Sequence, residues 1–226
     1  MMRHMESPEI TPEDAEKATG WRGSRRLWLD AARRALLDHG LDSVKIQPLA
    51  HSLNLSRTSF YWFFKDRQAL LDALLADWET RNTGAFTLAR DAYAETIAEA
   101  ILNLIAVFYD PELFDPDLDF AIRAWGQGAD KVKARVNAAD AARLDAIRAM
   151  FLRFGFDPDD ADVRARTVYL TQIGYISMQL REDMATRIAR VPGYVKTFTG
   201  TQPARGELAR FHARLGLNHA DQGAAD

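Results

Sequence analysis

The chain of 226 residues has no cysteine, which excludes a disulfide framework, a thiolate nucleophile and a cysteine zinc site. Long apolar runs are also missing. None approaches the roughly 18 residues of a membrane-spanning helix, and no secretory apolar segment follows the start. Common enzyme patterns are absent too: there is no His-Glu-x-x-His metal motif, Gly-x-Ser-x-Gly turn or phosphate-binding glycine loop. We therefore expect a cytoplasmic protein that is not an enzyme and uses no metal or cofactor.

The most informative stretch, residues 46–67, has the pattern of two short helices joined by a tight turn. Four apolar residues recur at helical spacing and can share one buried face of the first helix: Ile46, Leu49, Ala50 and Leu53. This helix is expected to start at about Lys45, because Pro48 is tolerated only in the first turn of a helix. Asn54 suits the left-handed turn position, and Ser56 suits the N-cap of the next helix. Phe60 and Phe64, four apart, should point inward together. This arrangement predicts a helix-turn-helix that places its second helix in the DNA major groove.

Polar and aromatic residues remain for the outer face of that second helix and its flanks. Trp62 is the most ambiguous of them, since packing against the first helix explains it as well as DNA does. The candidate DNA-binding residues are Gln47, Ser56, Arg57, Thr58, Ser59, Tyr61, Trp62, Lys65 and Arg67.

The distribution of charge supports this prediction. The net charge is −3, but residues 21–67 hold nine Lys/Arg against four Asp/Glu. A run of like charge is more often a solvated face than a binding site. Its coincidence with the helix-turn-helix favours nucleic acid.

The run SRTSFYWFFKDRQALLDAL closely resembles the signature of the TetR (tetracycline-repressor-type) regulators, and the resemblance extends from Trp21 to about Asn82. The chain departs from the family pattern at Lys45, Asn54, Phe60 and Phe63. The resemblance implies a palindromic double-stranded DNA operator, an effector cavity in the second domain, and release of DNA when the effector binds.

The whole chain is predicted to be all-α. A disordered arm (1–20) should precede a three-helix helix-turn-helix domain (21–66), and a larger helical domain (67–218) should bind effector and form the dimer, before a disordered tail (219–226). The helices of the larger domain are expected at about residues 67–82, 91–109, 129–154, 159–183 and 203–215. A short helix that ends at Trp125 is also expected, after the turn marked by Pro111 and Pro116.

An effector pocket is expected among three of these helices. Its lining would be mostly apolar and aromatic, suiting a small apolar or aromatic molecule held by one or two hydrogen bonds, and Arg123 leaves room for a single carboxylate. Each of these residues also fits a filled core, and Asn103 could simply bond to a neighbouring backbone group. The candidate ligand-binding residues are Tyr93, Ile97, Asn103, Phe108, Phe120, Trp125, Thr171, Tyr175 and Met178.

The segment 159–183 has apolar residues on two faces, although a monomer needs only one. Gly174, in its middle, costs about 1 kcal/mol in a helix interior, and close approach of a partner helix is one reason to accept it. We expect a homodimer with the following interface residues: Ile173, Gly174, Ile176, Leu180, Leu208 and Phe211.

These patterns favour a homodimeric, ligand-responsive transcriptional regulator, with repression as its expected mode. The main alternative is a DNA-binding adaptor without an effector, which would have no cavity in its second domain. A helical enzyme is less favoured, because it would need a polar catalytic cluster that the sequence does not show.

Overall fold

The structure, a computed structural model, describes residues 23–217. The chain divides into two compact units, residues 1–74 and 75–226, and the boundary falls inside one helix. The arm expected at residues 1–20 and the tail expected at 219–226 lie outside the described residues.

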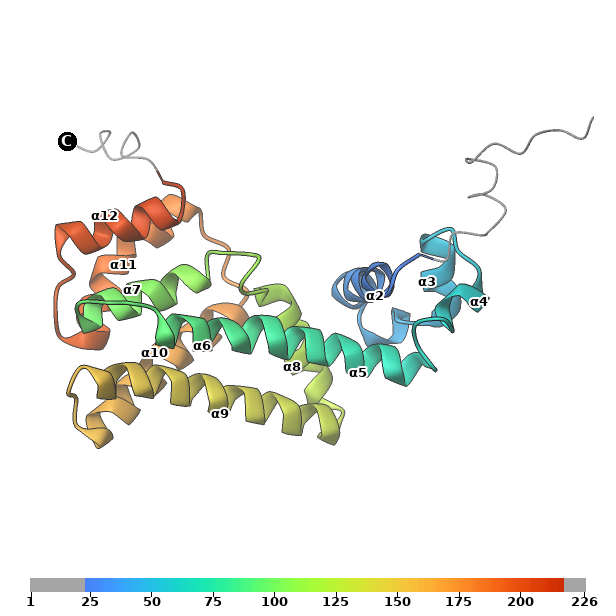
Figure 1. The fold of residues 1–226 in the computed structure, drawn as a ribbon, viewed down its shortest axis with the longest axis horizontal. Coiled ribbons are helices and arrows are strands. Elements are labelled where there is room, and N and C mark those ends of the chain that lie inside the picture. Colours follow the sequence, from blue (N-terminus) through green and yellow to red (C-terminus); the bar gives the residue numbers. More distant parts are fainter. Residues whose placement is uncertain (1–22, 218–226) are drawn as a thin grey trace, which may run out of the picture. The chain divides into compact units, whose positions relative to one another are not determined.

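The first unit is a small helical cluster (Figure 1). Trp28 and Phe60 are completely buried, as is Val44, so this cluster has a core of its own. Its elements are α2 (Arg25–His39), η1 (Leu41–Ser43), α3 (Ile46–Ser52), α4 (Arg57–Phe60) and most of α5 (Arg67–Trp78).

The second unit is also helical, and no strand occurs among residues 23–217, so the all-α prediction is confirmed. The long helix α9 packs against α6, α8 and α10. No helix in the described part of the chain is long and apolar enough to span a bilayer. The elements are η2 (Glu79–Thr83), α6 (Gly84–Asp91), α7 (Ile97–Val107), α8 (Pro116–Gln127), α9 (Asp130–Arg153), α10 (Pro158–Ser177), α11 (Met184–Thr199) and α12 (Arg205–Arg214).

Several helix boundaries differ from the sequence prediction. The helix expected at 67–82 ends at Trp78 and continues as the π-helical turn η2. The helix expected at 91–109 begins only at Ile97, because the Thr96 side chain caps it by accepting from Glu99 N. No helix was expected at residues 184–199, where α11 contains Pro192 in its interior. Burial of its apolar residues against the core accounts for that helix despite the proline.

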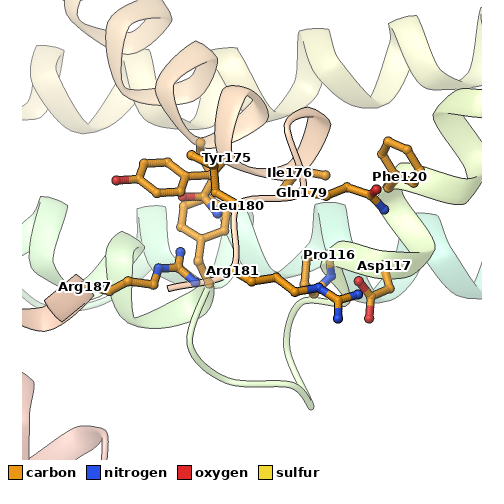
Figure 2. Close-up of a pocket in the computed structure, with 11 residues that line it drawn as sticks. Pro116, Asp117, Phe120, Tyr175, Ile176, Gln179, Leu180, Arg181 and Arg187 are labelled. Atoms are coloured by element: carbon orange, nitrogen blue, oxygen red, sulfur yellow. The ribbon is translucent and has the colours of Figure 1, made fainter. Parts of the chain in front are cut away.

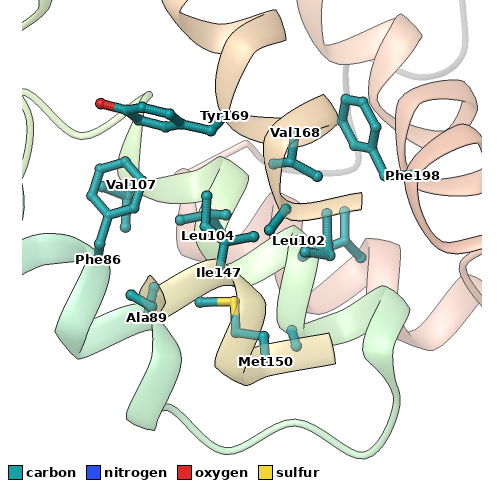
Figure 3. Packing of buried hydrophobic residues seen from close by; sticks show 14 of the residues in the cluster. Phe86, Ala89, Leu102, Leu104, Val107, Ile147, Met150, Val168, Tyr169 and Phe198 are labelled. Atoms are coloured by element: carbon teal, nitrogen blue, oxygen red, sulfur yellow. The ribbon is translucent and has the colours of Figure 1, made fainter. Parts of the chain in front are cut away.

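The core of the second unit is assembled from α6, α7, α9, α10 and α11 (Figure 3). Phe86 of α6 makes edge-on contacts with Phe108, Phe114 and Tyr169. Such aromatic pairs add roughly 0.5–1.5 kcal/mol each beyond the area that they bury. These contacts make the interior of the second unit well packed.

Candidate DNA-binding surface and effector cavity

The turn between α3 and α4 has the expected local chemistry. Asn54 adopts a left-handed backbone with φ of 53°, and Leu55 N donates to the carbonyl of Ala50 at 2.9 Å. The Ser56 side chain then caps α4 by accepting from Ser59 N at 3.2 Å. Both local predictions, the left-handed asparagine and the serine cap, are confirmed.

Aromatic packing sets the orientation of α4. Phe60 is completely buried, with its ring centroid 5.3 Å from that of Trp28 in an edge-on contact. Phe64 is also buried and stacks on Phe60 at 5.5 Å. Since both phenylalanines point inward as predicted, the opposite face of α4 points to solvent.

The outward face carries most of the residues predicted to bind DNA. Tyr61 is 51% exposed and Trp62 is 61% exposed, so neither completes the core of the small unit. The remaining exposed candidates in this region are Gln47, Ser56, Arg57, Thr58 and Lys65.

Two candidates are directed elsewhere. Ser59 was expected on the outer face, but it is only 7% exposed and its Oγ lies 3.0 Å from the Ser56 Oγ, within the cap. Arg67 donates from Nη2 to the Leu41 carbonyl at 3.0 Å and from Nε to the Val44 carbonyl. Its guanidinium therefore holds the η1 turn to the start of α5. No short-range sequence pattern predicts this role, because the partners are 23 and 26 residues away.

Residues 29–74 match the family model for bacterial regulatory proteins of the tetR family. This range begins within α2, contains the whole helix-turn-helix and ends within α5. Residues 29–74 form the DNA-binding domain of a TetR-family transcriptional regulator. The family is non-enzymatic, so the prediction that the chain is not an enzyme is confirmed. No curated protein sequence matches the chain.

Solved structures of TetR-family proteins share the fold. Mycobacterium smegmatis AmtR is 21% identical, with a TM-score of 0.61 over 87% of this chain and 96% of AmtR. A putative TetR-family regulator from Mesorhizobium loti is 18% identical, with a TM-score of 0.58 over 78% of this chain and 95% of that one. SmeT, the repressor of the Stenotrophomonas maltophilia multidrug efflux pump SmeDEF, is 16% identical, with a TM-score of 0.57 over 82% and 93%. At these identities the likeness concerns the fold alone.

Two small cavities lie where the effector pocket was expected. The larger, of about 110 Å³, opens between α8, α10 and the start of α11 (Figure 2). The smaller, of about 50 Å³, lies between α7, α10 and α11. Four residues line both: Phe108, Gln172, Tyr175 and Arg187. Phe120 lines the larger cavity and Thr171 the smaller, so four of the nine predicted ligand-binding residues meet here.

The other five candidates lie elsewhere. Tyr93 is 79% exposed and Met178 is 70% exposed, since α7 and α10 are both shorter than expected. Ile97 is buried in the core cluster, and Trp125 is not among the residues that line either cavity. Asn103 donates from Nδ2 to the Tyr93 carbonyl at 3.0 Å, which is the backbone-bonding alternative.

The second unit contains a buried charged cluster that the sequence did not predict. Asp119 and Arg143 are both fully buried, and Arg143 Nη1 donates to Asp119 Oδ1 at 2.9 Å. The guanidinium of Arg143 also lies 5.1 Å from the ring of Trp78 and 5.6 Å from that of Phe86. The partners are 24 residues apart, so only the packing of α8 on α9 reveals the pair.

Arg123 belongs to the same cluster, which corrects its predicted role. It donates from Nε to Asp119 at 2.7 Å and from Nη1 to Asp140 at 3.0 Å, and Nη2 reaches the Tyr169 hydroxyl at 3.0 Å. Burial lowers the pKa of Arg123, but these acidic partners outweigh burial and raise it above its ordinary value. Arg123 is therefore committed to internal carboxylates and does not hold one from a ligand.

The two apolar faces of α10 are used in the opposite sense to the prediction. Ile176 is buried, Ile173 packs against the core, and from α12 so do Phe211 and Leu208. Leu180 is partly exposed, beyond the end of the helix. Besides Leu180, the exposed large apolar residues of this segment are Val163, Leu170 and Met178, whose spacing places them on the same face as Gly174.

Proposed function

We propose that the protein is a homodimeric, ligand-responsive repressor of transcription that binds a palindromic operator in cytoplasmic DNA. The observation that carries this proposal is the geometry of α4. Phe60 and Phe64 lock its inner face, Ser56 caps its start, and Arg57 and Tyr61 are left exposed on the side away from the core. Repression is the activity named for SmeT, one of the proteins with this fold.

Exposed residues of α4 supply the contacts to DNA in this proposal. Arg57 and Tyr61 read base edges in the major groove, with Thr58 and Gln47 beside them. Ser56 and Lys65 flank the helix and bind phosphates, which sets the register on the duplex. Ser59 acts within the cap, and Arg67 orients α5 through the Leu41 and Val44 carbonyls.

Dimerisation is proposed through the exposed face of α10. A Cβ added at Gly174 would have nothing within 4 Å, so no contact inside the described chain requires glycine there. Its cost of about 1 kcal/mol in a helix interior is explained if a second copy packs closely at this point. Val163, Leu170 and Met178 then bury against the same helix of the partner, related by a two-fold axis.

Effector control is proposed through the cavities between α7, α8, α10 and α11. The smaller cavity is lined mainly by aromatic and apolar side chains, whereas the larger also has two glutamines and three charged residues, Asp117, Arg181 and Arg187, in its lining. Such a mixture of aromatic surface and polar groups suits a small polar ligand. A ligand that prefers one arrangement of the dimer shifts the population away from the form that binds DNA. The presence of these cavities favours this function over that of an adaptor without effector.

The test uses an operator selected by the wild-type protein from random DNA duplexes. Arg57→Ala/Tyr61→Ala should abolish measurable preference for this operator in fluorescence anisotropy, while circular dichroism shows an unchanged helical content. Arg34→Ala, which removes an exposed cation from α2, serves as the control and should bind nearly as well as wild type. Unchanged operator binding by the folded double variant would overturn the assignment of α4.

A further inference from the structure

Arg187 of α11 is placed at the junction of the two cavities and lines both of them. Its guanidinium carbon lies 5.0 Å from the ring centroid of Tyr109 and 5.3 Å from that of Tyr175. Aromatic faces attract a cation without neutralising it. Figure 2 shows the Arg187 side chain entering the larger cavity toward Tyr175, from the end opposite Asp117.

The charge of Arg187 is not matched by a carboxylate. Among residues 23–217, no Asp or Glu lies within ion-pair distance of Arg187, whereas nearby Glu182 is bound to Arg190. The larger cavity has a second cation, Arg181, but Figure 2 shows its side chain at the end occupied by Asp117. The Arg187 end of the cavity therefore has a positive charge that a bound anion could neutralise.

The neighbouring groups suit the oxygen atoms of such an anion. Burial raises the pKa of Tyr109, even though the charge of Arg187 opposes the shift, so its phenol stays neutral and keeps its proton. Gln172 lines both cavities and adds an amide that can donate. A carboxylate accepts several such hydrogen bonds at once, which neutral polar groups do less well.

The volumes limit the size of the ligand. The cavities measure about 110 and 50 Å³. Drug-sized ligands occupy pockets of roughly 300–1,000 Å³, whereas a cavity of about 150 Å³ accommodates benzene. The walls of the larger cavity include Phe108, Phe120 and Tyr175. The larger cavity alone is smaller than the benzene cavity, so it takes at most one ring, with the substituent directed toward Arg187 and the adjoining smaller cavity, and it excludes a fused polycyclic molecule without rearrangement.

We propose that the effector is a small aromatic monocarboxylate, with its ring between Phe108, Phe120 and Tyr175 and its carboxylate on Arg187. This inference rests on the proposed ligand-responsive function and names the chemical class of its ligand. The carboxylate was expected to bind Arg123, but the donors of Arg123 are used inside the fold. In this proposal Arg187, which lines the cavity, binds the carboxylate in its place.

Benzoate and benzamide form the decisive pair of probes, because they have nearly the same shape and differ in charge. Isothermal titration of the full-length protein should show binding of benzoate, with benzamide weaker by about tenfold or more, the worth of a charged hydrogen-bonded contact. Equal affinity for the two, or binding of neither, would overturn the proposal without reference to any variant.

Variants then locate the charge. Arg187→Gln should lower the affinity for benzoate by a similar factor, and Arg187→Lys should recover part of the loss. Arg148→Gln on α9 is the control and should bind benzoate as tightly as wild type. Arg181→Gln should have a smaller effect than Arg187→Gln. Full benzoate affinity in folded Arg187→Gln, verified by its melting temperature without ligand, would contradict the role of this residue.

Operator binding is measured in the same preparations, which separates the two proposals. Benzoate should lower the affinity of wild type for the selected operator and leave that of Arg187→Gln unchanged. Operator binding that persists while benzoate fails to bind would refute the ligand class alone. Loss of specific operator binding by the ligand-free protein would instead refute the proposed regulator function and leave the titration result standing.

Discussion

The indole Nε1 of Trp78 donates to Asp119 Oδ1 at 2.9 Å across 41 positions of sequence, and both side chains are fully buried. Trp78 is the last residue of α5, the helix that also contributes to the helix-turn-helix unit. The same carboxylate accepts from Arg143 of α9 and from Arg123 of α8. Since Trp78 itself belongs to the second unit, one buried aspartate joins three helices within that unit, and α8 is one of the helices that line the larger cavity.

Asp119→Asn should strongly destabilise the second unit. It removes the negative charge that compensates Arg143, and breaking a buried pair in this way costs about 3–5 kcal/mol. The measurement is the loss of helical signal in urea at pH 7. Asp162→Asn, which breaks the exposed pair with Arg166, is the control and should change stability little. A variant at Asp119 as stable as the control would show that the cluster does not hold the unit together.

The stability supplied by Asp119 should depend on pH. Burial would raise the pKa of Asp119, but Arg143 and Arg123 outweigh burial and hold it below its ordinary value. A lowered folded pKa means that this stability is fully present above the unfolded value of about 3.9 and is lost as pH falls through the folded value.

The stability gap between wild type and Asp119→Asn should therefore stay nearly constant from neutral pH down to about 5 and shrink below about 4. Urea midpoints measured over this range provide the check. A gap that closes near neutral pH would mean that another group, and not the Asp119 carboxyl, controls the effect.

Lys65→Ala and Arg57→Ala should weaken DNA binding in different ways. Lys65 follows α4 and is exposed, so its loss removes one phosphate contact for every sequence. The slope of log affinity against log salt should fall in magnitude by about one. Arg57→Ala should cost about 1–3 kcal/mol on the selected operator and less on random DNA. Equal losses on both DNAs for Arg57→Ala would place that residue on the phosphates instead.

Leu170→Glu should produce monomers. The residue is 61% exposed within one chain, so a glutamate is tolerated in the monomer but buried without a partner in the proposed interface. Light scattering at micromolar concentration measures the mass. Leu88→Glu, at a residue that is 65% exposed on α6, should remain a dimer. A wild-type monomer, or a dimer that persists in Leu170→Glu, would rule out this face of α10.

The sequence by itself determined the DNA-binding unit, because the signals there are local. A left-handed Asn54, a Ser56 cap and phenylalanines four residues apart act within one or two helical turns, and each has the predicted conformation or burial. The all-α class followed in the same way, from apolar residues at helical spacing.

Only tertiary packing decided which helix faces stay exposed and which charged side chains remain without an internal partner. Periodicity revealed two apolar faces on α10, but only contact with α9 showed that Ile176 is inside and Leu170 outside. Arg123 has an acidic neighbour one turn away in Asp119, yet its pairing with Asp140 spans 17 positions and depends on how two helices pack. Only the packing of α11 brings Arg187 to the cavities. Local propensity acts over a few residues, whereas burial and ion pairing depend on contacts between elements distant in sequence, and for that reason the binding sites of the second unit required the structure.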